Sequence, residues 1–461
     1  MGIYGKMKEQ ITDAIRARGL VASIVGFGYV GLCLGLLLAE RKVRVHGIDV
    51  RKSVVDMTNR GVSHVVEPEI PEALQRAVAE GLITATTDYS PIKDSDVVLV
   101  TVGTPLADDG TPRMDDVRDA AKQIGKFLQK GQMIILKSTV MPGVTEEVFL
   151  PAIERESGLK AGIDFGLAFC PERLAEGKAL KEIKLLPIVV GGIDAASSAC
   201  AAAFWEALGL ETITVSSAKT AEMTKLADNL WIDLNIALAN ELAMLCEKVG
   251  VDVLEVVRSA NTLPKGQNKV NILIPGSGVG GSCLVKDPWF VHKLAKGYGL
   301  DMIMPRVSRE VNDRMPAHMV KLTEDALKAA GKELSGSKVA VLGYAFNSAT
   351  NDTRSTPSKP YLEMLKGRAA GIKVFDKWVD QKEIAGIGLQ AAATLEEAVS
   401  GADCIVIITG HPEFRQMDLG KVKHLAAKGC AVVDGRHVID PAAAIAAGFI
   451  YRGVGRGRWA K

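Results

Sequence analysis

The sequence lacks any uncharged apolar run that approaches the about 20 residues a transmembrane helix needs, so we expect no membrane span. It also lacks a secretory signal at its amino terminus, because Lys6, Lys8 and Glu9 precede any apolar run. Lys6 stands where a myristoylation signal would place Ser or Thr. These absences predict a cytoplasmic protein.

The sequence also lacks paired cysteines and an excess of charge of one sign. The seven cysteines are odd in number and not paired in spacing, and neither they nor the seven histidines cluster, which predicts free thiols and no metal site. The 56 basic and 54 acidic residues are scattered, so nothing indicates nucleic-acid binding. With 461 residues, of which 48% are hydrophobic, the chain is expected to fold as two or three globular domains.

A glycine-rich turn stands near the start of the chain. An apolar strand over 20–26 leads into Gly26, Gly28 and Gly31, a helical run follows, and a second strand over 43–48 ends at Asp49. In this arrangement the glycines admit a pyrophosphate and the carboxylate binds the ribose hydroxyls. Asp49 would repel a 2′-phosphate and favours NAD over NADP, although Arg51 could offset that repulsion.

Further strands over 96–102 and 133–136, with a helix over 117–128 between them, predict a doubly wound sheet. Thr104 and Thr139 follow these strands and should face the cofactor, unless they serve only in turns and caps. The residues expected to bind the cofactor are Gly26, Gly28, Tyr29, Val30, Gly31, Asp49, Arg51, Thr104, Thr139 and Arg354.

The segment 218–249 contains neither Gly nor Pro and has apolar residues at helical spacing, so it predicts a helix that bridges two domains or forms a dimer interface. Lys225 and Asn229 share one face of it, either facing a cleft or solvated, and Asp228 points elsewhere. A second α/β unit begins at Lys338, lacks the third glycine, and is expected to bind a nucleotide. Its polar loop 351–357 is either a clamp over phosphates or a solvated linker, and the tail 453–461 is expected to be disordered.

Cys283 lies in the run Gly276-Ser277-Gly278-Val279-Gly280-Gly281-Ser282, and Asp287 follows it by four residues. A thiolate beside a nicotinamide cofactor can hold an aldehyde as a thiohemiacetal, which yields a second hydride to become a thioester. A small buried thiol is the alternative interpretation.

The motifs GFGYVG, VGTPL, KSTV, CPERLAEGKAL, AEMTKLADN, GVGGSCLVKDPWF and GYAFNSATNDTRSTPS occur in this order. Over about residues 20–440 the chain resembles the UDP-glucose/GDP-mannose 6-dehydrogenase family. The resemblance implies an α/β fold with two Rossmann-like doubly wound domains joined by a long central helix. It further implies an NAD-binding domain over 1–215, a central helical domain over 216–330, a UDP-sugar-binding domain over 331–461, and a homodimer.

The resemblance implies four-electron oxidation of the C6 hydroxyl of a UDP-sugar, with Cys283 as the nucleophile. Lys225 and Asn229 would steady the C6 oxygen, and of Glu172 and Glu176 the latter would be the base for thioester hydrolysis. Asp287 would hold a water or tune Cys283 and Lys225, and Thr139 would fix a water or the nicotinamide. The substrate-binding residues it implies are Arg173, Leu174, Lys225, Asn229, Lys269, Asn271, Gly280, Phe346 and Arg436.

The motifs point to two possible sugars. The segments over 64–69 and 287–290 resemble the branch acting on UDP-N-acetylhexosamines, especially UDP-N-acetyl-D-mannosamine. Ser282, Lys269 and Asn347 depart from that branch, and Ser282 with Lys286 resembles the UDP-glucose branch. A two-electron hydroxyacid dehydrogenase would share the first half but would not need Cys283, and a nucleotide sensor would lack the set Lys225, Cys283 and Glu176.

Overall fold

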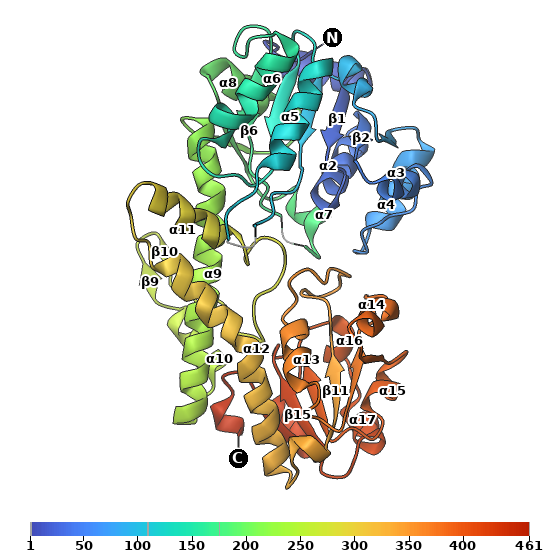
Figure 1. The fold of residues 1–461 in the computed structure, drawn as a ribbon, viewed down its shortest axis with the longest axis vertical. Helices are drawn as coiled ribbons and strands as arrows, with labels where there is room; N and C mark the ends of the chain where they lie inside the picture. The colour runs from blue at the N-terminus through green and yellow to red at the C-terminus, as the bar shows by residue number, and fades with distance from the viewer. Residues whose placement is uncertain (1, 108–109, 175, 461) are drawn as a thin grey trace. The chain divides into compact units, whose positions relative to one another are not determined.

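The computed structural model describes residues 2–107, 110–174 and 176–460, and these divide into two compact units (Figure 1). Unit 1 comprises residues 1–228 and 289–298, and unit 2 comprises residues 229–288 and 299–461. No helix in the described ranges is both long and apolar enough to span a membrane.

Unit 1 is built on an eight-stranded sheet in the order β3-β2-β1-β4-β5-β6-β7-β8. Neighbouring strands are parallel except for the antiparallel pair β6 and β7. The first six positions follow the strand order of a dinucleotide-binding fold. The strands are β1 (Val21–Val25), β2 (Arg44–Ile48), β3 (Ile83–Thr86), β4 (Val97–Val100), β5 (Met133–Leu136), β6 (Gly166–Phe169), β7 (Ile188–Gly192) and β8 (Thr212–Thr214).

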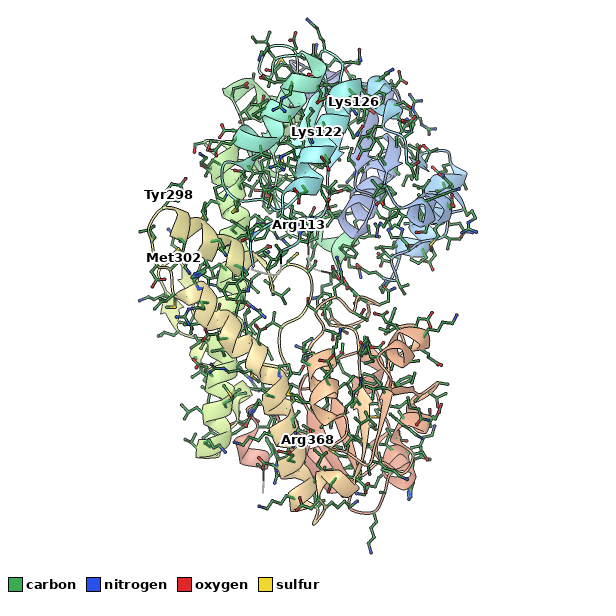
Figure 2. The ribbon with its side chains drawn as sticks, in the orientation of Figure 1. Arg113, Lys122, Lys126, Tyr298, Met302 and Arg368 are labelled. Carbon is green, nitrogen blue, oxygen red and sulfur yellow. The ribbon has the colours of Figure 1, made fainter. Side chains whose placement is uncertain are left out.

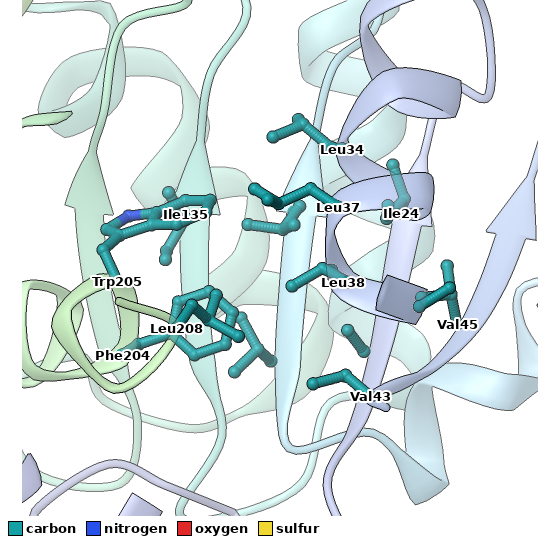
Figure 3. Packing of buried hydrophobic residues seen from close by; sticks show 14 of the residues in the cluster. Ile24, Leu34, Leu37, Leu38, Val43, Val45, Ile135, Phe204, Trp205 and Leu208 are labelled. Carbon is teal, nitrogen blue, oxygen red and sulfur yellow. The ribbon is translucent and has the colours of Figure 1, made fainter. Parts of the chain in front are cut away.

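Helices precede and connect these strands, and they contribute apolar side chains to the buried cluster of the unit. They are α1 (Lys8–Arg16), α2 (Tyr29–Glu40), α3 (Lys52–Asn59), α4 (Ile70–Ala79), η1 (Ser90–Asp94), α5 (Asp115–Phe127), η2 (Thr145–Phe149), α6 (Leu150–Ser157), α7 (Ala179–Glu182) and α8 (Ala195–Ala207). Leu34 and Leu38 of α2 and Trp205 of α8 pack in one cluster against Ile24 and Ile135 of the strands (Figure 3). The outer side of α5 is polar, and Lys122 and Lys126 project from it (Figure 2).

Unit 2 contains a fully parallel six-stranded sheet in the order β13-β12-β11-β14-β15-β16, which repeats the order of the first six strands of unit 1. Its strands are β11 (Lys338–Leu342), β12 (Gly371–Phe375), β13 (Gln390–Ala391), β14 (Cys404–Ile407), β15 (Ala431–Asp434) and β16 (Ile450–Gly453). A two-stranded hairpin, β9 (Pro264–Lys265) and β10 (Asn268–Lys269), stands apart from the sheet. The expected fold class, two doubly wound α/β sheets, is confirmed.

The helix predicted over 218–249 is α9 (Ala218–Val249), and the division between units 1 and 2 falls within it, after Asp228. Its 32 residues make it about 48 Å long. The remaining helices are α10 (Val253–Ala260), α11 (Asp287–Gly297), α12 (Met304–Ala329), η3 (Leu334–Gly336), α13 (Ser358–Leu365), α14 (Gln381–Gly386), α15 (Leu395–Val399), α16 (Pro412–Arg415), α17 (Leu419–Leu425), α18 (Pro441–Ala446) and η4 (Gly457–Trp459).

The expectation of a disordered tail over 453–461 is wrong for the residues described, which end at 460. Val454 is fully buried, and the indole Nε1 of Trp459 donates to Asp252 at 3.0 Å. A Cβ on Gly457 would lie 2.3 Å from the carbonyl oxygen of Cys246. The glycines of this tail therefore permit close packing against the end of α9, whereas the sequence analysis took them as a sign of flexibility.

Candidate active site

The turn between β1 and α2 has the geometry of a dinucleotide site. Gly26 has a φ of +90°, and a Cβ there would lie 2.9 Å from Thr101. A Cβ on Gly31 would lie 2.2 Å from the carbonyl oxygen of Gly26, so both glycines are required by the protein's own packing. On Gly28 it would meet only the Arg51 guanidinium, at 3.6 Å. The open space above Gly28 fits close approach of a pyrophosphate to the N-terminus of α2.

Asp49 follows β2, and its side chain is fixed by hydrogen bonds. The carboxylate is nearly buried and accepts hydrogen bonds from the Arg51 backbone N–H at 2.9 Å and from its guanidinium at 3.0 and 3.1 Å. Burial alone would raise the pKa of Asp49, but the bonds from Arg51 outweigh it and the pKa lies below its ordinary value. Asp49 is therefore a fixed anion, as the sequence analysis required for binding ribose hydroxyls, and these residues fit a dinucleotide.

A lysine that the sequence analysis missed holds the start of the loop after β6, which carries Glu172 and Glu176. Lys137 is 2% exposed, and its ammonium donates to the carbonyls of Cys170 at 3.1 Å and Pro171 at 3.4 Å. The Glu172 carboxylate lies 3.6 Å from the same ammonium. The sequence did hold a signal for this role, since Lys137 directly follows the apolar strand β5. The end of a central parallel strand is buried on both faces, so a charged residue there needs partners inside the protein.

Glu172 is engaged within its own loop. One carboxylate oxygen accepts the backbone N–H groups of Arg173 at 2.8 Å and Leu174 at 2.9 Å. Arg173 in turn donates through Nε to Asp228 on α9 at 2.9 Å. The loop at Glu172 is thus ordered by its own N–H groups and attached to α9 through Asp228.

Lys225 and Asn229 lie one turn apart on α9 and are only 7% and 5% exposed, so the solvated-surface interpretation is wrong for both. The Asn229 amide donates to the Asp287 carboxylate at 2.5 Å. The other carboxylate oxygen of Asp287 accepts from the Lys286 ammonium at 2.7 Å, and Asp287 is fully buried. Asp287 is thus a buried carboxylate that accepts hydrogen bonds from Asn229 and from Lys286.

Cys283 is the one exposed cysteine among the seven, all of which are described and free. Burial raises the pKa of Cys170 and Cys200 to about 11 and that of Cys430 to about 12. Those thiols remain protonated and inaccessible at neutral pH. The alternative interpretation of Cys283 as a buried thiol is wrong.

The residues around Cys283 fix its backbone. Its carbonyl accepts the N–H groups of Lys286 at 3.0 Å and Asp287 at 2.9 Å. Preceding it, a Cβ on Gly280 would lie 2.6 Å from the Cβ of Phe346, and one on Gly281 would lie 2.7 Å from the ring of Phe346. Gly280 and Phe346, both predicted to bind substrate, are therefore brought together.

Arg436 also supports this glycine run. Its guanidinium donates to the carbonyls of Gly278 at 3.2 Å and Ile408 at 2.8 Å. Burial lowers the pKa of Arg436 to about 10, which still leaves it charged at neutral pH. Arg436, which follows β15, thus contacts the loop that carries Cys283 within the same unit.

Other predicted residues lie elsewhere in their units. Lys269 is exposed in the hairpin strand β10, and the Asn271 carbonyl accepts from Asn235 at 2.9 Å. The Arg354 side chain pairs with Asp352, and its carbonyl accepts the Gly281 N–H at 3.0 Å. Thr104 is buried after β4, and Thr139 is half-buried after β5. In the part of the chain that the structure describes, no group of three or more His, Cys, Asp or Glu residues could hold a metal ion.

Comparison with known families gives three consecutive matches. Residues 21–208 match the NAD binding domain of the UDP-glucose/GDP-mannose dehydrogenase family. Residues 219–314 match its central domain, and residues 340–441 match its UDP binding domain.

Individual relatives agree with these matches. UDP-N-acetyl-D-mannosamine dehydrogenase of Pyrococcus horikoshii is 35% identical over 436 residues, covering 94% of this chain and 99% of that protein, and a solved structure of it has a TM-score of 0.84. NDP-N-acetyl-D-galactosaminuronic acid dehydrogenase of Methanosarcina mazei is 36% identical with a TM-score of 0.78, covering 100% of this chain and 99% of the other. A UDP-glucose dehydrogenase from Pyrobaculum islandicum is 30% identical with a TM-score of 0.84, covering 95% and 98%.

Proposed function

Because this chain belongs to the UDP-glucose/GDP-mannose dehydrogenase family and is an NAD-dependent oxidoreductase, we propose that it oxidises the C6 hydroxyl of a UDP-sugar to the carboxylate through a covalent intermediate on Cys283. The observation that carries the proposal is the exposure of Cys283 while the other six cysteines are buried. An accessible thiol beside a buried carboxylate suits addition to an aldehyde.

Oxidation of an alcohol to an acid removes four electrons in two steps, so the aldehyde formed in the first step must stay bound for the second. NAD supplies the hydride acceptor for each of two two-electron oxidations. After the first, the Cys283 sulfur adds to the aldehyde carbon and the carbonyl oxygen takes up a proton, which gives a thiohemiacetal. Loss of a second hydride from C6, together with the hydroxyl proton, leaves a thioester. Water then adds to C6 as the C–S bond breaks, which releases the acid and returns the thiol of Cys283.

The charged and polar residues have separate roles in this scheme. We assign Lys225 and Asn229 to stabilising the C6 oxygen as it gains negative charge. Asp287 accepts from Asn229 and Lys286, so it orients the Asn229 amide. Glu176 takes the proton from the hydrolytic water, and Thr139 positions that water or the nicotinamide. Glu172, with its carboxylate engaged by backbone N–H groups, orders the loop before Glu176.

We propose UDP-N-acetyl-D-mannosamine as the substrate, in preference to UDP-glucose. Two relatives named for N-acetylated sugars are 35% and 36% identical to this chain, whereas the UDP-glucose dehydrogenase is 30% identical. Ser282 and Lys286 favour the second candidate, UDP-glucose. NAD reduction with a panel of UDP-sugars separates the two, and faster turnover of UDP-glucose would overturn the assignment.

The stoichiometry of NADH tests the reaction class. Two NADH per substrate are expected for the four-electron oxidation. One would indicate a two-electron hydroxyacid dehydrogenase, and none would indicate a nucleotide sensor. Either of the latter results would refute the proposal.

We also propose a homodimer formed through α9, in a reducing cytoplasm that keeps all seven thiols free. Trp231, Leu238 and Leu245 are spaced by seven residues, which places them on one stripe of the helix, and they are 48%, 49% and 58% exposed. A stripe of large apolar side chains on a long helix fits self-association. Leu238→Glu should convert a dimer into a monomer in sedimentation experiments, and a wild-type monomer would refute this arrangement.

A further inference from the structure

Glu67, in the segment between α3 and α4, is a buried carboxylate with three donors. It is 4% exposed. One oxygen accepts the Tyr29 hydroxyl at 2.5 Å and the Gly177 N–H at 2.9 Å, and the other accepts the Ala179 N–H at 2.9 Å. A buried charge is tolerated when its lone pairs are met by hydrogen-bond donors, as they are here. All of these groups belong to unit 1.

Two of the three donors belong to the segment that follows Glu176. Gly177 comes directly after it, and Ala179 is the first residue of α7. Because both N–H groups point to one carboxylate, Glu67 fixes the chain on the carboxyl side of Glu176. Lys137 fixes the same loop at its start, through the carbonyls of Cys170 and Pro171. Glu176 thus lies between two buried charges that hold the backbone.

The third donor belongs to the cofactor fingerprint. Tyr29 is the first residue of α2 and follows Gly28, at the helix end where the pyrophosphate of a dinucleotide binds. Burial, aided by the neighbouring Cys33 and by Glu67, raises the pKa of Tyr29 far above its ordinary value. Its hydroxyl therefore stays protonated and donates to Glu67 throughout the working pH range.

We propose that Glu67 is a positioning residue that couples NAD binding to the placement of Glu176. In this proposal bound NAD restricts the motion of the start of α2. The Tyr29–Glu67 hydrogen bond then restricts Glu67, and with it the N–H groups of Gly177 and Ala179. By linkage, an ordered loop in turn strengthens NAD binding. The catalytic consequence rests on the proposed role of Glu176, whereas the coupling itself does not.

Tyr29→Phe tests the coupling, since it removes only the hydroxyl and keeps the ring. Glu69→Gln is the matched control, because Glu69 lies two residues from Glu67 but is exposed, and its ion pair with Lys181 at 3.6 Å is a surface contact. Hydrogen exchange of the peptide containing Gly177 and Ala179 is measured with and without NAD. We expect NAD to slow this exchange in the wild type and in Glu69→Gln but not in Tyr29→Phe, whose dissociation constant for NAD should rise about fivefold or more.

Glu67→Gln gives the kinetic counterpart. It keeps the side-chain volume but replaces one acceptor with a donor, so at least one of the three bonds is lost. With Glu176 misplaced, kcat should fall by up to about 100-fold at the hydrolysis step, with KM for the UDP-sugar unchanged. A purely structural role would lower the melting temperature and leave the NAD-dependent protection intact.

Equal NAD-dependent protection in Tyr29→Phe and the wild type would overturn the proposal, and Tyr29→Phe carries the test alone if Glu67→Gln does not fold. Exchange and NAD binding need no turnover, so they remain valid if the role of Cys283 is refuted. Conversely, loss of the coupling would leave the covalent mechanism standing.

Discussion

The Asn229 side-chain amide donates a 2.5 Å hydrogen bond to the fully buried carboxylate of Asp287. This bond joins α9 to the first residue of α11, and the N–H of Asp287 also donates to the carbonyl of Cys283 at 2.9 Å. Hydrogen bonds among three residues of unit 2 therefore help to set the position of the candidate nucleophile. The sequence analysis placed all three residues in one site, although it did not predict the hydrogen bond between Asn229 and Asp287.

Asn229→Ala should impair both activity and stability. Removing the amide takes one donor from a buried carboxylate, which costs about 1–3 kcal/mol of unfolding free energy. Displacement of Cys283 should lower kcat by about 100-fold. Steady-state kinetics and urea unfolding measure the two effects. Asn268→Ala, in the exposed strand β10, is the control and should change neither.

Cys283→Ala and Glu176→Gln should fail at different steps. Without its thiol the enzyme cannot form the thioester, so uronate production should cease. With the thiol present but no base, a covalent adduct should accumulate on the Cys283 peptide of Glu176→Gln. Mass spectrometry after incubation with substrate and NAD detects the adduct. Wild-type uronate production by Cys283→Ala would end the covalent mechanism.

Asp49 should determine the preference for NAD over NADP. Its carboxylate is fixed by Arg51, and a 2′-phosphate brought beside it would meet like charge. Asp49→Ala removes the repulsion and frees Arg51, so the ratio of kcat/KM for NADP to that for NAD should rise at least about tenfold. Equal kcat/KM values for the two cofactors in the wild type would contradict this assignment.

The C-terminal tail should contribute to stability. Gly457→Ala forces a Cβ to within 2.3 Å of the Cys246 carbonyl, and such overpacking costs about 1–3 kcal/mol. Gly336→Ala is the matched control, since a Cβ there meets nothing within 4 Å. Thermal unfolding should show a lower melting temperature for Gly457→Ala alone. Equal melting temperatures would mean that the tail does not pack in solution.

Asp376→Asn should destabilise the protein in a pH-dependent way. The buried Asp376 carboxylate accepts the backbone N–H groups of Tyr344 at 2.6 Å and Ala345 at 2.9 Å and lies 3.0 Å from His411 Nε2. Burial raises its pKa, but His411 and these N–H groups lower it more, so the folded pKa lies below the ordinary 3.8. The stability gained is present above the unfolded pKa and is lost as pH falls through the folded pKa.

The unfolding free energies of Asp376→Asn and the wild type should therefore differ by about 1–3 kcal/mol at pH 7. Denaturant unfolding at several pH values should show this difference shrinking below pH 3.8. A difference that stays constant with pH would show that the ionised carboxylate is not the source of the stability.

The sequence by itself determined the features that depend on neighbours along the chain. The glycines at Gly26 and Gly31, the strand–helix alternation and the full extent of α9 were all predicted, because backbone conformation and helical periodicity are local properties. Cys283 was singled out for the same reason, from the glycine run around it. The order of the motifs was sufficient to identify the family.

Only the tertiary structure decided which side chains are buried and which of them meet. The burial of Lys137, the three donors on Glu67 and the packing of the tail on Cys246 all join residues far apart in the sequence. Glycines near a chain end are compatible with either flexibility or close packing, and a carboxylate in a loop is compatible with either solvent or burial. The choice depends on the surfaces that folding brings against them, and this information is not contained in any local pattern.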